Sequence, residues 1–418
     1  MPVSNEEYYE RVVRRRAAVT SYTLLPEPEP RPAPFRVISV DDHLIEPADI
    51  FDGRLPSRFA DVAPRLVADE SGRESWLLED KLMPVFGMDS CVGRPAAEWS
   101  MAPLRHDEMR PGSWDINRRV ADMDLNGIDA SLNFPSLWTG FAGSAFTRMK
   151  DADLALALVR AWNDWHLEVW AGAYPGRIIP LQVTYLLDPE IAADEVRRNA
   201  ERGFRAVTFS ENPTGQGLPS IHSGHWDPLF AACEETGTVL CLHTGSSGHT
   251  TETSEDAPFE VNISLFPTSG IVSAADWIWS RVPVRFPNLK IALSEGGVGW
   301  LPLAIDWLDH TNRKHDVWTG TWRGIDLRPS EVLLRNFWFC TIDEPLGLRA
   351  VLQQVPQARV MVEVDYPHAD SSWPDTQELL ARLFDGLDGP TIEAVSHGHA
   401  AELFRWPLRE PATTSKPR

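Results

Sequence analysis

The 418-residue sequence has little of what marks membrane-spanning, secreted or zinc-cluster proteins. Its four cysteines, Cys91, Cys233, Cys241 and Cys340, are far apart and form no C-x-x-C pair, which argues against a structural zinc cluster or a disulfide framework. No apolar stretch approaches the roughly 20 residues that span a bilayer. Residues 1–16 are charged where a signal peptide has its apolar centre. We therefore expect a soluble, cytoplasmic protein.

Basic residues are also scarce: 39 stand against 60 acidic ones, giving a formal net charge of -21. Nucleic acids and anionic membranes are bound by basic patches, so this balance argues against both as partners. A small anionic substrate remains compatible, because a bound cation can reverse the local field. Apolar residues make up 43 % of the chain, enough for a large core.

Composition divides the chain into three parts. Residues 1–34 are expected to form a charged arm and an extended linker, LLPEPEPRPAPF, with five prolines. Residues 35–410 form the folded domain, and residues 411–418 a short tail. Within the domain, residues 52–127 are too long for an ordinary connection. We predict that they form a flap over one end of the domain, with a β-hairpin that turns at Glu79-Asp80.

Short apolar runs alternate with amphipathic stretches along the domain, as in a (β/α)8 TIM barrel. No G-x-G-x-x-G follows the first run, which argues against a dinucleotide-binding open sheet, and we expect no organic cofactor. Helices are predicted over 151–172, 188–203 and 225–237. The eight predicted strands are 36–42, 128–135, 178–184, 204–210, 238–243, 289–294, 336–342 and 359–364.

Ionisable residues follow four of these strands, at the end where barrel enzymes place their active sites. They are Asp41 and His43 on the first strand, His243 on the fifth, Glu295 after the sixth and Asp365 after the eighth. Asp41 and His43 are two apart, so both should face the barrel interior, and Asp42 the opposite side. Each residue alone could be a core or turn residue. Together they would be destabilised by desolvation and repulsion unless a cation holds them. One divalent ion, zinc, manganese or iron(II), suits these ligands.

The segments VISVDDHLIEP, VLCLHTGSSG, FPNLKIALSEGGVGWLP and MVEVDYPHADSSWP resemble the amidohydrolase superfamily from about residue 36 to 405. The resemblance is to the amidohydrolase-related group that includes aminocarboxymuconate-semialdehyde decarboxylase and gamma-resorcylate decarboxylase. It implies that Asp41, His43, His243 and Asp365 bind the metal. Many of these decarboxylases have a histidine where this chain has Glu295, so Glu295 is expected either to transfer the proton or to bind the metal.

If Glu295 binds the metal, proton transfer falls to His368, His222, His225 or His249. We expect catalytic roles for Glu295, His368 and Asp365, and we expect the substrate to contact Glu46, Trp138, His222, His249 and Trp300. The aromatic residues Phe134, Trp138, Trp300 and Trp373 suit a flat apolar substrate, although aromatic side chains more often belong to a core.

Three functions remain open. The first is a metal-dependent carboxy-lyase that acts on an aromatic or unsaturated carboxylic acid. The second is a metal-dependent hydrolase of an amide, lactone or other cyclic bond. The third is an inactive barrel used for binding. The acid-rich ligand set makes the metal less electrophilic, which favours decarboxylation over hydrolysis and manganese over zinc. The resemblance also implies a homodimer.

Overall fold

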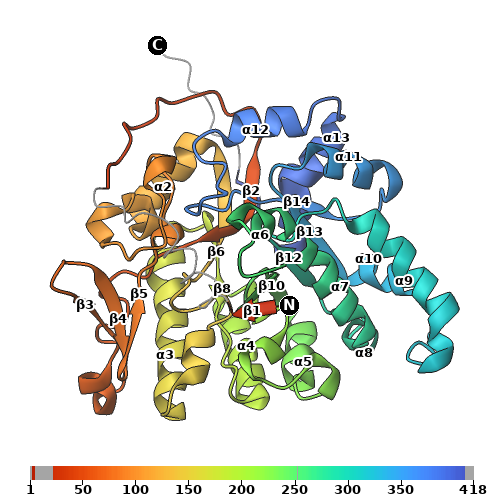
Figure 1. Ribbon diagram of the computed structural model, residues 1–418, viewed down its shortest axis with the longest axis horizontal. Coiled ribbons are helices and arrows are strands. Elements are labelled where there is room, and N and C mark those ends of the chain that lie inside the picture. The colour runs from red at the N-terminus through yellow and green to blue at the C-terminus, as the bar shows by residue number, and fades with distance from the viewer. Residues whose placement is uncertain (1, 5–21, 252, 410–418) are drawn as a thin grey trace.

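The computed structural model describes residues 2–4, 22–251 and 253–409 of the chain. Residues 5–21 of the predicted arm and the predicted tail 411–418 lie outside these described residues. Helices surround a central group of strands, as Figure 1 shows. None of the described helices is long and apolar enough to cross a membrane.

The predicted (β/α)8 barrel is confirmed. Its strands pair in parallel in two sheets, in the orders β14-β13-β12-β10-β9-β8 and β2-β6-β7. The sheets meet where the Asp365 N–H donates to the Asp41 carbonyl, at 2.8 Å. The strands are β2 (Val37–His43), β6 (Ile128–Phe134), β7 (Ile178–Ile179), β8 (Leu181–Gln182), β9 (Ala206–Ser210), β10 (Val239–His243), β12 (Ile291–Ser294), β13 (Phe337–Thr341) and β14 (Val360–Val362).

The third predicted strand, 178–184, is split into β7 and β8. Pro180 lies between them and has no N–H for a ladder hydrogen bond. Its carbonyl still accepts from the Arg205 N–H at 3.0 Å, so the segment bridges the two sheets. β7 pairs with β6, and β8 pairs with β9.

The predicted helices begin and end close to the expected residues. Asp151 and Asp188 cap α3 and α4 by accepting backbone N–H groups, and Gly203 ends α4 in the left-handed conformation. Helix α3 continues as a π-helical turn to Ala171. The helices are α2 (Ile116–Asn126), α3 (Ala152–Trp165), α4 (Pro189–Arg202), α5 (Asp227–Thr236), α6 (Phe259–Leu265), α7 (Thr268–Trp279), α8 (Val282–Arg285), α9 (Leu301–His315), α10 (Pro329–Asn336), α11 (Pro345–Gln354), α12 (Thr376–Leu383), α13 (Gly389–Glu393) and α14 (His399–Phe404).

The insertion contains a three-stranded antiparallel sheet of β3 (Arg65–Ala68), β4 (Glu74–Leu78) and β5 (Lys81–Pro84). The predicted hairpin is confirmed, because Glu79 and Asp80 connect β4 to β5. Further along, the Cys91 N–H donates to the carbonyl of Pro367 after β14 at 2.8 Å, which fastens the insertion beside the site described below. At the other end of the chain, β1 (Pro2–Ser4) pairs with β11 (His249–Thr251).

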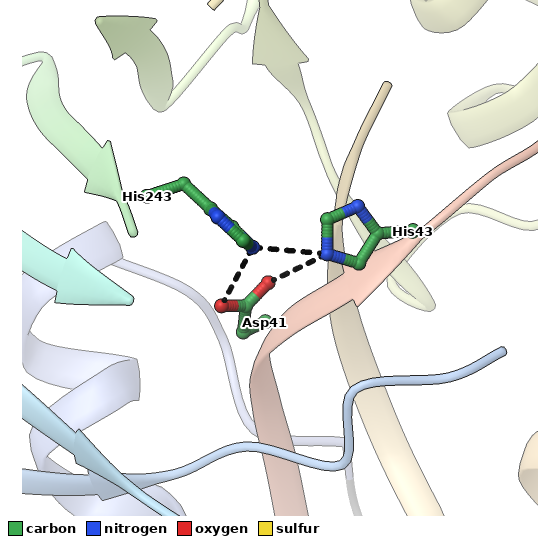
Figure 2. A group of neighbouring side chains, drawn as sticks. All are labelled: Asp41, His43 and His243. Carbon is green, nitrogen blue, oxygen red and sulfur yellow. Dashed lines mark hydrogen bonds and ion pairs between the residues drawn. The ribbon is translucent and has the colours of Figure 1, made fainter. Parts of the chain in front are cut away.

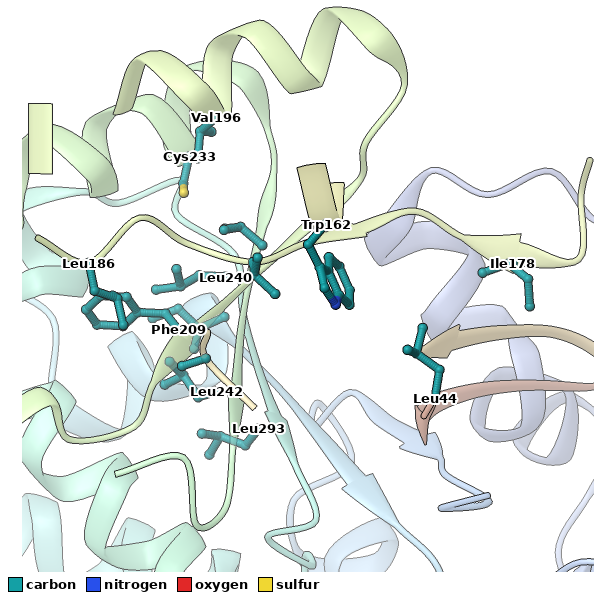
Figure 3. Packing of buried hydrophobic residues seen from close by; sticks show 14 of the residues in the cluster. Leu44, Trp162, Ile178, Leu186, Val196, Phe209, Cys233, Leu240, Leu242 and Leu293 are labelled. Carbon is teal, nitrogen blue, oxygen red and sulfur yellow. The ribbon is translucent and has the colours of Figure 1, made fainter. Parts of the chain in front are cut away.

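The apolar residues form two cores. Alternate residues of the strands, such as Ile38, Val40 and Cys241, fill the barrel interior. Residues on the outward faces, such as Leu240 and Leu242, pack against the surrounding helices, and Figure 3 shows this outer core. The interior core ends in polar side chains at the carboxyl ends of the strands, where the site lies.

Candidate metal centre

A bulge in β2 determines which of its acidic residues faces the interior. Ile38 and Val40 belong to the interior core, so unbroken alternation would point Asp42 inwards. The pairing of β2 with β6 shifts between Ser39 and Asp42, and this shift turns Asp41 and His43 inwards instead. Asp42 turns away and accepts hydrogen bonds from the Ser39 and Ser131 hydroxyls and the Tyr366 N–H. The predicted orientation of all three residues is confirmed.

Three side chains, Asp41, His43 and His243, converge inside the barrel, and Asp365 lies against one of them. The Nε2 atoms of His43 and His243 are 3.0 Å apart, and each lies 3.4 Å from an oxygen of Asp41. Figure 2 shows these three side chains facing one another. Asp365 Oδ1 lies 3.5 Å from His43 Nε2 and forms a second possible metal-binding group with His43 and His368. The side chains of Asp41, His43, His243 and Asp365 are each at most 1 % exposed.

The donor atoms fit a metal ion. Neither oxygen of Asp41 nor of Asp365 accepts a hydrogen bond, although all four atoms are buried. Such orphaned carboxylate oxygens are destabilising without a positive partner. Donor atoms about 2.1 Å from a common ion lie about 3.0–3.4 Å from one another. The separations of 3.0–3.4 Å among Asp41, His43 and His243 match that spacing, and Asp365 lies 3.5 Å from His43.

The two histidines are oriented for this role by backbone carbonyls. His43 Nδ1 lies 3.3 Å from the carbonyl oxygen of Pro135, and His243 Nδ1 lies 2.6 Å from that of Thr244. A carbonyl only accepts, so each Nδ1 carries the hydrogen and each neutral ring presents a bare Nε2. Two bare nitrogen atoms repel at 3.0 Å, so a proton or a cation must lie between them.

The pKa values indicate which side chains of the site hold protons when no metal ion is bound. Burial lowers the pKa of His43 to about 4. Burial also disfavours charge on His243, but the Asp41 carboxylate outweighs it and raises the pKa of His243 to about 9. Burial, reinforced by Glu295 and Asp41, raises the pKa of Asp365 well above its usual range. Without a cation, the cluster therefore retains protons to limit its negative charge.

Glu295 and His368 lie beside the cluster. Glu295 Oε2 is 3.5 Å from His243 Nε2. His368 stacks on His43 with ring centroids 3.8 Å apart, and its Nδ1 lies 2.9 Å from Asp365 Oδ1. The side chains of Glu295 and His368 keep 16 % and 13 % exposure, whereas those of Asp41, His43, His243 and Asp365 are sealed. The structure thus brings together every predicted metal and catalytic residue.

The structure does not bring the five predicted substrate-binding residues together. Glu46 is fully buried and accepts hydrogen bonds from three core side chains. Trp138 is buried in the outer core and stacks on Trp76 at 4.8 Å. The Trp300 indole N–H donates to the carbonyl of Gly296, within the loop that follows Glu295.

The other two predicted substrate-binding residues are histidines. His222 Nε2 lies 2.7 Å from Asp276 Oδ1, and His249 Nε2 lies 2.9 Å from the carbonyl of Gly215. His225, the further candidate for proton transfer, packs its ring edge-on against Trp226.

Two buried carboxyl groups near the site were missed. Glu363 lies two residues before Asp365 on the inward face of the eighth strand, and Met361 precedes it in the interior core. The two-residue period alone could have found it. Asp89 reaches the site from the insertion, with Oδ1 3.9 Å from His368 Nε2. No pattern in residues 52–127 predicts that contact.

A cavity of about 370 Å³ lies beside His368. The indole rings of Trp99 and Trp373 line it, together with Pro26 and Pro28 from the proline-rich segment. Trp373 was among the aromatic residues expected near a substrate. The cavity therefore joins the described part of the predicted arm, the insertion and the loop after β14.

Comparisons with known proteins agree with this architecture. A family model described as amidohydrolase matches residues 58–406. An amidohydrolase structure from Mycobacterium avium subsp. paratuberculosis K-10 is 22 % identical, with a TM-score of 0.67, and the match covers 89 % of this chain and 99 % of the other. The 5-carboxyvanillate decarboxylase from Sphingomonas paucimobilis is 21 % identical, with a TM-score of 0.62 and coverage of 89 % and 100 %.

A dihydroxybenzoic acid decarboxylase from Polaromonas sp. JS666, solved with bound manganese and the inhibitor 2-nitroresorcinol, is 18 % identical. Its TM-score is 0.60, and the match covers 89 % of this chain and 97 % of the other. A search of curated proteins found no significant match. At these identities the solved structures establish a shared fold. Because the family model spans most of the sequence, the chain belongs to the amidohydrolase family.

Proposed function

We propose that the protein is a metal-dependent, non-oxidative carboxy-lyase acting on an aromatic or unsaturated carboxylic acid. The observation that carries this proposal is the sealed cluster of Asp41, His43, His243 and Asp365, with an acid, Glu295, beside it. The names of two similar structures, both aromatic-acid decarboxylases, support the reaction class.

Asp41, His43, His243 and Asp365 would hold one divalent ion. When bound, it supplies a positive charge that orients the substrate's carboxylate or a neighbouring oxygen and stabilises developing negative charge. Two carboxylates and two imidazoles suit manganese, zinc or iron(II), and the acidic share favours manganese. Manganese is also the metal in the Polaromonas enzyme.

Glu295 is the proposed proton donor. Burial raises its pKa to about 8, and Asp41 adds to this effect against the opposing influence of His243. In the ion-free site Glu295 is therefore mostly protonated at neutral pH, which is the form that a general acid needs. In the reaction, the bond from the substrate carbon to its carboxylate breaks and CO2 leaves. The electron pair left on that carbon takes the Glu295 proton, and Glu295 then regains a proton from water.

His368 would connect the cluster to the substrate. His368 Nδ1 lies 2.9 Å from Asp365 Oδ1, and His368 Nε2 neither accepts nor donates a hydrogen bond. Trp99 and Trp373 line the adjacent cavity, and aromatic residues suit a flat apolar substrate. Assembly as a homodimer stays a prediction.

The test is CO2 release from manganese-loaded protein over a panel of hydroxybenzoates and unsaturated acids. Glu295→Gln keeps the shape of the side chain but has no acidic proton, so we expect kcat to fall at least about 100-fold. The matched control is Glu402→Gln, which removes an exposed carboxylate on α14 and should retain full activity. Equal activity of Glu295→Gln and wild type would contradict the role of Glu295.

Hydrolysis is the second candidate, because the family model that matches is that of an amidohydrolase. Water would then attack the carbonyl of an amide, lactone or other cyclic substrate, and Glu295 would act first as a base. The raised pKa of Glu295 disfavours that ionised form at neutral pH. A ring-opened product that carries ¹⁸O from labelled water, without CO2, would establish hydrolysis instead.

A further inference from the structure

The backbone of Glu295 is held in a conformation that side chains normally avoid. Its φ angle is +56°, in the left-handed region, although it is not a glycine. That conformation is unfavourable for a residue with a Cβ, because the Cβ approaches neighbouring backbone atoms. Two glycines follow in the sequence, so the chain could adopt the turn without placing a glutamate there. Neighbouring groups must therefore stabilise Glu295 in this position.

Glu363 makes the contact that fixes this backbone. The Glu295 N–H donates to Glu363 Oε2 at 3.0 Å. Glu363 is 2 % exposed and points into the barrel just below Asp365. The hydrogen bond therefore ties the loop after β12, which carries Glu295, to the strand that carries Asp365.

A second glutamate holds the same loop further along. Glu344, which follows β13, accepts from the Val298 N–H at 2.6 Å and from the Gly299 N–H at 3.0 Å. These contacts fix the start of α9. Glu344 does not contact the Glu295 N–H. Among the described residues, that N–H donates a hydrogen bond only to Glu363.

We propose that Glu363 is a positioning residue that holds the Glu295 carboxyl beside His243 through the Glu295 main chain. The inference deepens the proposed function, because it rests on Glu295 as the proton donor. Glu363 touches neither the substrate nor the reacting atoms. Its role requires an oxygen atom at the Oε2 position and does not require a negative charge.

The test compares three substitutions in the full-length protein. Glu363→Gln keeps an acceptor oxygen at the same reach. Glu363→Met keeps the length but removes the acceptor, and Glu363→Asp keeps the carboxylate but shortens the side chain by one methylene. The Asp side chain is small and polar. If the Met variant does not fold, the Asp variant still tests the loss of the oxygen atom at the Oε2 position. Hydrogen exchange resolved to single amides measures the Glu295 N–H directly, without any substrate.

We expect the Glu295 amide to exchange at least about tenfold faster in the Met and Asp variants and at the wild-type rate in the Gln variant. Metal content should stay at the wild-type level in all three. With a substrate in hand, kcat should fall at least about tenfold in Met and Asp with KM within about twofold, and Gln should retain activity. Glu344→Met should speed exchange at Val298 and Gly299 but not at Glu295.

Unchanged exchange of the Glu295 amide in the Met and Asp variants would overturn the proposal. A Gln variant with exchange as fast and kcat as low as the Met variant would also overturn it. The acceptor oxygen would then not be what positions Glu295. An inactive wild type with the expected exchange pattern would refute the carboxy-lyase function alone and would support the positioning contact.

Discussion

Glu46 gives the clearest quantitative prediction, because three donors in the core converge on its carboxyl group. Its Oε1 accepts from the Thr139 hydroxyl at 2.7 Å and the Trp162 indole N–H at 3.1 Å, and its Oε2 accepts from the Ser136 hydroxyl. Glu46 follows the site-bearing strand β2 by three residues and is fully buried. Glu46→Leu would leave all three donors buried without an acceptor.

Each unsatisfied donor costs about 1–3 kcal/mol, and removal of a desolvated carboxyl group returns part of that sum. Burial raises the pKa of Glu46, which shows that the folded state resists its ionised form. We expect Glu46→Leu to lower the free energy of unfolding by about 3 kcal/mol. With an unfolding entropy of about 2.1 cal/mol/K per residue, the melting temperature should fall by about 3–4 °C.

Glu46→Gln is the matched control. The Gln oxygen replaces Oε1 and accepts from Thr139 and Trp162, while its amide donates to the Ser136 hydroxyl, which can also accept. The free energy of unfolding of this variant should fall by less than about 1 kcal/mol. Urea unfolding of the three proteins measures both values. Equal stability of the Leu and Gln variants would refute the hydrogen-bond account. Lost substrate binding at unchanged stability would instead assign Glu46 to the substrate site.

Three further predictions concern protonation and metal. Burial lowers the pKa of His166 to about 3, from an ordinary value of 6.5. The unfolded state therefore binds more protons than the folded state, and the free energy of unfolding falls as pH drops from about 6.5 towards 3. Between pH 7 and 5 this loss should be about 2 kcal/mol, and His166→Phe should remove it from the pH dependence of unfolding; an unchanged dependence would contradict the assignment. Manganese at about 100 times its Kd should add about 2.7 kcal/mol, hence about 3 °C in melting temperature. His243→Ala should abolish that shift, and a shift of equal size in the variant would place the ion elsewhere. Asp365→Asn keeps an acceptor but loses charge, so it should weaken manganese binding in a titration at least about tenfold, whereas an unchanged Kd would exclude Asp365 as a ligand.

The barrel could be predicted from the sequence because the local sequence of each strand is enough to identify it. Apolar runs covered on both sides, together with capped helices between them, define parallel strands without knowledge of their neighbours. The convergence of Asp41, His243 and Asp365 followed from the barrel rule that places strand ends on one rim. The split at Pro180 was not predicted, although proline cannot donate to a ladder and could have indicated it.

The orientation of Asp41 was predicted from spacing alone, but its cause was not. Period-two alternation continued from Ile38 and Val40 would have turned Asp42 inwards, and only the β2–β6 pairing reveals the bulge that reverses it. A bulge depends on the register between two strands, which no single segment encodes.

The contacts that the sequence did not predict come mainly from the insertion, residues 52–127. Asp89 reaches His368, and Cys91 bonds to the loop after β14, through tertiary contacts between segments nearly 280 residues apart. Glu46 and Trp138 were expected to contact the substrate because polar and aromatic residues near a rim suggest binding. The structure places both in the core, where Glu46 accepts hydrogen bonds and the Trp138 ring stacks on Trp76.

Bound metal is the first property to measure, because the proposed chemistry depends on an ion held by this site. The protein would be purified without chelator or added metal, and bound metal measured by plasma mass spectrometry for wild type, His243→Ala and Asp365→Ala. We expect close to one manganese, zinc or iron ion per wild-type chain and little in either variant. A metal-free wild type that binds none of these ions on titration would contradict the metal centre, and the family would then describe the fold of this chain but not its chemistry.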